Sequence, residues 1–194
     1  MTKNRLLNLV IFLCRFYKML CVVLFLAMTT LLIHIQVDPD SYNSLDFHVN
    51  IAEDPGLGIT SKHKWQLDGQ VAPEDYKVFR LEKLTTGSLY IVFIKYTAIL
   101  VLVFLCVKEF QRVAESVKNI QTFKEGNVQS FIKLGKYLFI LFLLYSFSFF
   151  NFEQGRLSIV SISFLPLVLM LLAFVMAEIF KEGNQLSEDN DLTI

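Results

Sequence analysis

Residues 108–136 read KEFQRVAESVKNIQTFKEGNVQSFIKLGK and form a polar stretch between two strongly apolar runs. Apolar side chains recur in the first part at a spacing of three and four residues, which places them on one face of a helix. They are Phe110, Val113, Ala114, Val117 and Ile120. The pattern breaks after Gln121, and Asn127 stands where an N-cap residue would start a second helix. The stretch therefore predicts a helical hairpin that stands off a membrane surface.

The composition of the chain is typical of an integral membrane protein. Of its 194 residues, 54% are hydrophobic and 19 are Phe, which is too apolar for an ordinary soluble domain. A helix needs about 17–25 mainly apolar residues to cross the ~30 Å of hydrocarbon in a bilayer. Four stretches meet or nearly meet that length, at about 19–37, 89–107, 137–152 and 157–177. We expect an all-α membrane protein in which residues 1–194 form a single membrane domain with four transmembrane helices.

Basic residues are distributed unevenly around these spans. The first 18 residues and the hairpin 108–136 are rich in Lys and Arg, whereas the connection between spans three and four carries only Arg156. Loops with an excess of Lys and Arg stay in the cytosol. Both termini and the hairpin are therefore predicted to be cytosolic, and residues 38–88 are predicted to lie outside.

The outer loop 38–88 carries a strand pattern. Leu45, Phe47, Val49 and Ile51 alternate with polar residues, which is the period of a strand with one buried face. Residues 64–70 and 76–84 are weaker strand candidates. We expect a small strand-containing extracytoplasmic loop between spans one and two, and a long loop with little order is the alternative.

Polar residues within the spans gather in their outer halves. Lys95 is the most informative of them, because an ionisable group inside a span is costly and by default suggests function. One interpretation is an outer polar pocket that binds an anionic or polar ligand. The other is that Lys95 snorkels to the headgroups while the serines pack helices together. The candidate pocket residues are His34, Gln36, Lys95, Ser146, Ser148, Asn151 and Ser161.

Cysteine usage and motif content argue against a metal, a cofactor or an active site. Cys14, Cys21 and Cys106 all lie near the predicted cytosolic side, and the outer loop has no cysteine, so no structural disulfide is expected. No histidine stands near these cysteines. The chain also lacks the motifs of metalloproteases, serine hydrolases and phosphate-binding loops. We expect a protein that is not an enzyme.

The last residues, 178–194, form an acidic tail whose charge is opposite to that of the basic hairpin. The tail and hairpin are the sizeable cytosolic surfaces, which makes them the candidate partner surface. The alternative is a solvated helix end followed by a frayed tail. The candidate partner-surface residues are Arg112, Glu115, Lys118, Glu188, Asp191, Leu192 and Ile194.

Two motifs carry a resemblance to a known family. The first is Phe123-x-x-x-Asn127-Val128-x-x-Phe131-x-x-Leu134-Gly135, and the second is Ala177-Glu178-Ile-Phe-x-Glu-Gly183-x-x-Leu186-x-Glu188-x-x-Asp191-Leu-Thr-Ile194. The chain resembles an uncharacterised bacterial domain-of-unknown-function family of small four-span membrane proteins. Its members are often encoded beside a Cro/C1-type helix-turn-helix regulator. The resemblance implies a bacterial cytoplasmic (inner) membrane protein with a transcription regulator as its partner.

The first motif also has a structural interpretation from its residues. Phe123 would fill the corner of the hairpin, and Asn127 would cap the third helix. Phe131 would pack, and Gly135 would let helices two and three approach closely as they enter the bilayer. These four residues are the candidate hairpin structural motif.

Two function classes remain open. The first is a non-enzymatic sensor or docking partner for a cytosolic regulator, which contacts no nucleic acid itself. The second is a small transporter, channel or peptide-immunity protein, for which a homo-oligomer would be needed to make room for a pore. Transport is less favoured because the sequence has no repeated halves with matching helix breaks.

Overall fold

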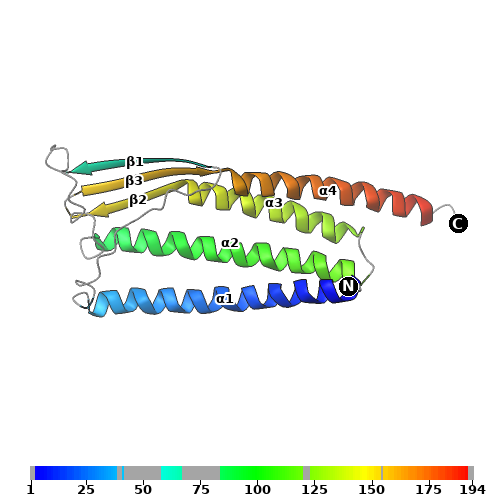
Figure 1. Cartoon of the computed structure of the whole chain (residues 1–194), viewed down its shortest axis with the longest axis horizontal. Coiled ribbons are helices and arrows are strands. Elements are labelled where there is room, and N and C mark those ends of the chain that lie inside the picture. The colour runs from blue at the N-terminus through cyan, green and yellow to red at the C-terminus, as the bar shows by residue number, and fades with distance from the viewer. Residues whose placement is uncertain are drawn as a thin grey trace. The chain divides into compact units, whose positions relative to one another are not determined.

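The computed structural model describes residues 3–38, 41, 58–66, 84–119, 123–153 and 155–191. Within these residues, four helices and three strands follow one another along the chain (Figure 1). All four helices are long and apolar enough to cross a membrane, as the composition predicted. The elements are α1 (Lys3–Val37), β1 (Gly58–Gln66), α2 (Thr86–Lys118), α3 (Glu125–Ser146), β2 (Phe147–Phe152), β3 (Gly155–Ser163) and α4 (Phe164–Asp191).

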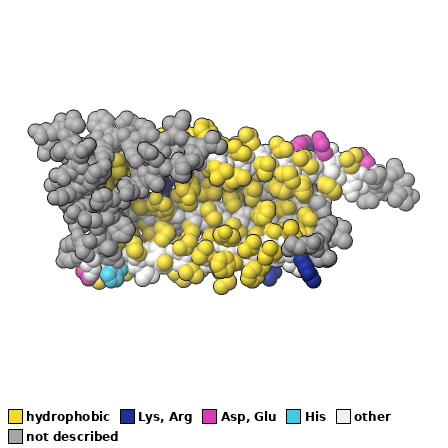
Figure 2. All heavy atoms as spheres, viewed as in Figure 1, with side chains coloured by type: hydrophobic (Ala, Val, Ile, Leu, Met, Phe, Trp, Pro, Cys, Tyr) yellow, Lys and Arg dark blue, Asp and Glu magenta, His cyan; other side chains and the backbone are white. Residues whose placement is uncertain are grey.

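The helices present apolar side chains outward, which is the pattern of a protein surrounded by lipid. Leu, Val, Ile and Phe side chains on α1 and α4 are exposed in the protein alone, and hydrophobic side chains cover much of the face seen in Figure 2. The 35 residues of α1 measure about 52 Å at 1.5 Å per residue. That length exceeds the ~30 Å of a hydrocarbon core, so α1 extends beyond the lipid.

The chain divides into two compact units by its internal contacts. Unit 1 contains Met1–Val23, Leu100–Leu141 and Leu165–Ile194, and unit 2 contains Leu24–Ile99 and Phe142–Phe164. Each unit therefore takes parts of several helices, and we describe the two units separately.

Unit 2 contains an antiparallel sheet in the order β1-β3-β2 (Figure 1). The central strand β3 pairs with β1 from Gly58↔Ser163 to Gln66↔Gly155. It pairs with β2 from Phe147↔Val160 to Phe152↔Gly155. Four of the six residues of β2 are Phe, and β3 contains Ile159, Val160 and Ile162; aromatic and β-branched residues fit a pleated, half-buried surface. The core of the sheet is formed by Phe152, Leu157 and Ile159, with Leu84 and Phe150 packed against it.

The sheet corrects the predicted bounds of spans three and four. Residues 147–152 and 157–163 were predicted to be transmembrane helix, and they are β2 and most of β3. Length and apolarity alone do not distinguish a helix from a hairpin of apolar strands. Of the strands predicted in the outer loop, 64–70 overlaps the end of β1. The segment 45–51 and nearly all of 76–84 lie outside the described residues.

Unit 1 holds the hairpin and the core beside it. The helix α2 ends at Lys118 and α3 begins at Glu125, so residues 108–136 do contain a helix end, a corner and a helix start. The core joins α2, α3 and α4 and consists of Val113, Val128, Phe131, Ala177 and Phe180. The acidic tail is not frayed at its start, because α4 continues as a regular helix to Asp191.

Candidate functional site between α3 and α4

The two family-like motifs, more than 40 residues apart in the sequence, pack against each other in unit 1. The ring of Phe131 on α3 lies 4.9 Å from that of Phe180 on α4, edge to face. Phe123, just before α3, lies 5.7 Å from the same ring. Phe131 and Phe180 are only 9% and 8% exposed. An aromatic pair of this kind contributes about 0.5–1.5 kcal/mol beyond the area it buries, so Phe180 joins the start of α3 to α4.

Two glycines allow these helices to approach closely. A Cβ added to Gly183 would overlap the ring of Phe123. A Cβ added to Gly135 would lie 2.7 Å from the ring of Phe174, well inside normal van der Waals contact. Each motif therefore supplies a glycine that accepts a phenylalanine ring from the region around the other motif.

A groove of about 650 Å³ runs between the start of α3 and the end of α4. Val128 and Ala177 are buried in the groove, and carboxylates stand along it at Glu125, Glu178 and Glu188. The single cation on it, Lys181, donates to Glu178 over 2.8 Å. The groove thus combines apolar surface with an excess of negative charge. Its lining residues are Glu125, Val128, Gln129, Ile132, Phe174, Ala177, Glu178, Lys181, Asn184, Gln185 and Glu188.

The end of α4 keeps its helical form through contacts with its own side chains. Asn184 Nδ2 donates to Glu188 Oε1 over 2.9 Å, one helical turn along, where such pairs support a helix. Leu186 is 65% exposed on this acidic segment. The surface beside the groove is therefore a structured helix that carries an exposed apolar side chain.

A buried polar cluster joins α2 to α3 in the same unit. Glu109 is 5% exposed and Ser130 is 1% exposed. Ser130 Oγ donates to Glu109 Oε2 over 2.8 Å, and Arg112 Nη1 donates to the same oxygen over 2.8 Å. The guanidinium of Arg112 thus balances the charge of the buried Glu109 carboxylate, and the Ser130 hydroxyl donates a further hydrogen bond to it.

A second polar group lies one turn further along α2. Gln111 Nε2 donates to Glu115 Oε1 over 2.6 Å, and Arg15 of α1 lies 3.9 Å from the same oxygen. This ion pair brings α1 to α2. Arg112 and Glu115, predicted as partner surface, therefore both have partners within the chain.

The comparison with known families agrees with these features. A family described as "Protein of unknown function (DUF2975)" matches residues 70–194, which contain α2, α3, α4 and the β2–β3 hairpin. The chain belongs to this family. No curated protein and no solved structure matches the chain.

Within the family region, the hairpin motif packs differently from the prediction. Asn127 does not cap α3, because the helix begins at Glu125 and Asn127 lies within its first turn. Its side chain instead donates to Ser116 Oγ of α2 over 2.9 Å, and Asn127 is buried. The ring nearest to a Cβ at Gly135 is Phe174 of α4, a neighbour that the prediction did not name. Phe123 lies over Gly183 of α4.

Lys95, the central residue of the predicted outer pocket, contacts the start of β2 in unit 2. Its Nζ donates to the carbonyl oxygen of Phe147 over 2.7 Å and to Ser148 Oγ. Phe147 is the first residue of β2 and directly follows Ser146, the last residue of α3. Lys95 thus joins α2 to the α3–β2 junction.

The other residues of the predicted outer pocket have separate partners. Gln36 Nε2 donates to the Tyr90 hydroxyl over 2.7 Å, and Ser146 Oγ donates to the Phe142 carbonyl of its own helix over 2.8 Å. Asn151 N–H donates to Ser88 Oγ over 3.0 Å. The structure brings Lys95 and Ser148 together, and it uses the others in different contacts. His34 lies in the last turn of α1, and Ser161 lies on β3 opposite Thr60.

The rest of the predicted partner surface lies at the ends of two helices. Lys118 is the exposed last residue of α2, and Glu188 lines the groove. Asp191 ends α4, whereas Leu192 and Ile194 lie outside the described residues.

Sequence reasoning missed Glu109, Ser130 and Gln111 as buried polar residues. The i,i+3 spacing of Glu109 and Arg112 is a visible signal of a pair on one helix face. The involvement of Ser130 depends on how α3 packs, and no local pattern carries it.

Proposed function

We propose that this membrane protein is a non-enzymatic docking protein that holds a cytosolic partner in the groove between α3 and α4. The groove is the observation that carries the proposal, because it places apolar surface between carboxylates on two helices that pack tightly together. Helix-in-groove recognition uses this combination of a preformed apolar groove and flanking charges.

The charges of the groove define the kind of partner segment. Glu125, Glu178 and Glu188 face one cation, Lys181, which is itself paired with Glu178. A segment with Lys or Arg on one face and apolar side chains on the other complements this surface. Charge complementarity raises the association rate and is weakened by salt, whereas the apolar contact is not screened.

The charge distribution of the chain supports a cytosolic location for the groove. Basic residues are concentrated in residues 1–18 and in the hairpin 108–136, and the positive-inside rule places such segments in the cytosol. The groove lies at the start of α3 and the end of α4, beside this hairpin. Together with the family resemblance, this supports a helix-turn-helix transcription regulator as the partner.

Docking accounts for the structure better than sensing through an outer pocket. Lys95, Gln36 and Asn151 are engaged in contacts that join α1 to α2 and α2 to β2. The sensor function would need an outer ligand site, and the residues predicted to form it serve as structural links.

Binding of a purified regulator to the full chain in nanodiscs tests the proposal. The probe is a Cro/C1-type helix-turn-helix regulator of the kind often encoded beside members of the family, added at increasing concentration at low and at physiological salt. The double variant Glu125→Gln, Glu188→Gln removes two carboxylates from the groove. We expect its Kd for the regulator to be at least tenfold higher than that of the unchanged chain at low salt. Ile132→Trp fills the apolar surface, and we expect it to weaken binding at both salt concentrations.

The matched control is Glu153→Gln, which removes an exposed carboxylate that does not line the groove. It should bind the regulator as the unchanged chain does. A Kd that is unaffected by both groove variants would overturn the proposal. Deletion of 187–194 is a further test, since it touches no apolar span and should weaken retention of the regulator on membranes.

A further inference from the structure

A second cavity in unit 1 is apolar throughout. Its volume is about 520 Å³, within the ~300–1,000 Å³ range of small-molecule sites. Tyr17 carries the one hydroxyl among its lining side chains. The lining residues are Val10, Leu13, Cys14, Tyr17, Cys106, Val107, Phe110, Phe131, Leu134, Leu138, Leu169, Leu172, Ala173 and Met176.

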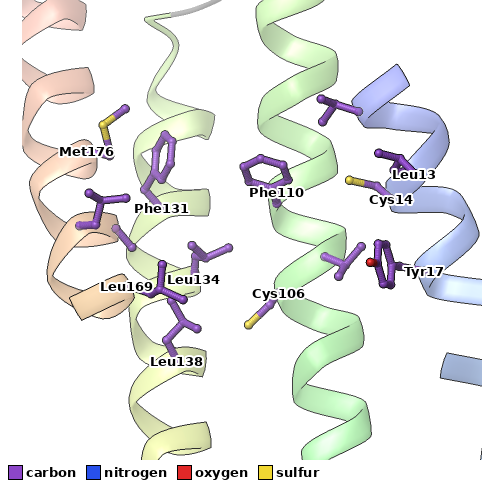
Figure 3. Close-up of a pocket in the computed structure, with 14 residues that line it drawn as sticks. Leu13, Cys14, Tyr17, Cys106, Phe110, Phe131, Leu134, Leu138, Leu169 and Met176 are labelled. Atoms are coloured by element: carbon purple, nitrogen blue, oxygen red, sulfur yellow. The ribbon is translucent and has the colours of Figure 1, made fainter. Parts of the chain in front are cut away.

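All four helices contribute to this cavity. Figure 3 shows Cys106 and Phe110 of α2 pointing toward Phe131 and Leu134 of α3, with Cys14 of α1 on the other side of α2. The cavity belongs to the end of the bundle that carries the α2–α3 hairpin, because Phe110 and Phe131 both lie in the stretch 108–136.

The cavity is open at its edge to the surroundings of the protein. Phe110 is 47% exposed and Leu172 is 60% exposed, although both line the cavity. Hydrocarbon is the medium around the apolar parts of these helices. An apolar cavity does not hold water favourably, so a hydrocarbon chain is the occupant that its lining favours.

The residues around the cavity carry positive charge. Arg15 and Lys18 follow the lining residues Cys14 and Tyr17, and Lys108 follows Val107. Of the acids near these positions, Glu109 is paired with Arg112. Glu115 lies 3.9 Å from Arg15 and offsets one of the three cations, so Lys18 and Lys108 carry the excess positive charge. Basic clusters at the end of a span attract anionic headgroups.

We infer that the cavity is a binding site for one anionic phospholipid, with an acyl chain inside the cavity and the phosphate among Arg15, Lys18 and Lys108. The apolar lining of the cavity favours the acyl chain of the lipid, and the basic residues favour its anionic headgroup. The site is independent of the proposed docking groove, which is lined by other residues.

Tryptophan quenching by brominated lipids tests the inference on the full chain in vesicles. The native Trp65 is replaced by Phe, and Phe110→Trp places a single reporter in the cavity lining. The vesicles are zwitterionic and contain a small fraction of lipid with brominated acyl chains, either anionic or zwitterionic. We expect the anionic brominated lipid to quench the reporter at least twofold more than the zwitterionic one.

The control reporter is Leu171→Trp on α4, which is 59% exposed and does not line the cavity. Both lipids should quench it equally. Cys106→Phe fills the cavity and should remove the preference of the reporter at position 110 for quenching by anionic lipid. The double variant Arg15→Gln, Lys18→Gln should reduce that preference. Each variant is checked by circular dichroism and by the Leu171→Trp reporter, so that misfolding is recognised separately.

Equal quenching of the cavity reporter by the two lipids would overturn the inference. So would a preference that persists unchanged when Cys106→Phe fills the cavity. The first result would mean that ordinary bilayer lipid is next to position 110. The second would mean that anionic lipid gathers near position 110 without entering the cavity.

Discussion

Phe123 lies over Gly183, with its ring in the space that the Cβ of any other residue at position 183 would occupy. The two residues are 60 positions apart in the sequence and belong to the two motifs that the family resemblance rests on. Their contact extends the aromatic packing of Phe131 and Phe180 to the corner of the hairpin.

Gly183→Ala should destabilise the packing of α4 against the start of α3. The added Cβ meets the Phe123 ring, and overpacking of this kind costs about 1–3 kcal/mol. We expect a lower melting temperature in detergent, measured by circular dichroism. Gly126→Ala is the matched control, because a Cβ there meets nothing within 4 Å and alanine favours a helix.

The same pair allows a rescue experiment. Phe123→Ala removes the ring that a Cβ at position 183 would meet, so the double variant should lose less stability than the sum of the two single variants. Additive losses would show that Phe123 and Gly183 do not interact.

Ser130→Ala should reduce stability more than the loss of an exposed polar contact does. It leaves the buried Glu109 with one fewer donor, and a hydrogen bond to a charged group contributes about 1.5–3 kcal/mol. The melting temperature of the purified chain measures the effect.

The control for this variant is Lys181→Ala. Its ion pair with Glu178 has the same i,i+3 spacing and the same 2.8 Å distance as Arg112 with Glu109, but the Glu178 side chain is 61% exposed. Exposed pairs contribute about 0–1 kcal/mol. If Lys181→Ala lowered the melting temperature as much as Ser130→Ala does, the burial of Glu109 would not be the reason for the effect of Ser130→Ala.

Lys95→Met should weaken the junction between α3 and β2. The substitution keeps the apolar stem of the side chain and removes the cation that contacts the Phe147 carbonyl and Ser148. We expect a loss of about 1–3 kcal/mol, the range for hydrogen bonds to charged groups, measured by thermal unfolding in detergent. Ser148→Ala keeps the bond to the carbonyl and should have a smaller effect, while Lys133→Met, at an exposed lysine of α3, should have little.

Reporter fusions test the predicted orientation. An enzyme active only outside the cytosol should be active when fused at residue 60 and inactive at residue 190, because the basic segments favour cytosolic termini. Activity of the reporter at residue 190 would show that the orientation is the opposite of the predicted one, and the groove would then lie outside the cytosol.

Local properties of the sequence were enough to predict part of this structure. The length of the apolar runs predicted four membrane-spanning helices, and the break after residue 121 predicted a corner between α2 and α3. Both features depend on residues that are neighbours along the chain, so composition and helical period carry them. The same reasoning selected Phe131, which lies in a core, and Glu188, which lines the groove, although it did not identify their neighbours.

Only the tertiary structure decided which elements and residues meet. Residues 147–152 and 157–163 were predicted as parts of spans three and four, and they form β2 and most of β3 because β1, far away in the sequence, pairs with β3. A Cβ at Gly135 would meet a ring from α4, and Lys95 contacts the first residue of β2. The period of a helix determines which residues share a face. The rotation and register of the packed helices determine what that face contacts, and these arise from interactions across the whole fold.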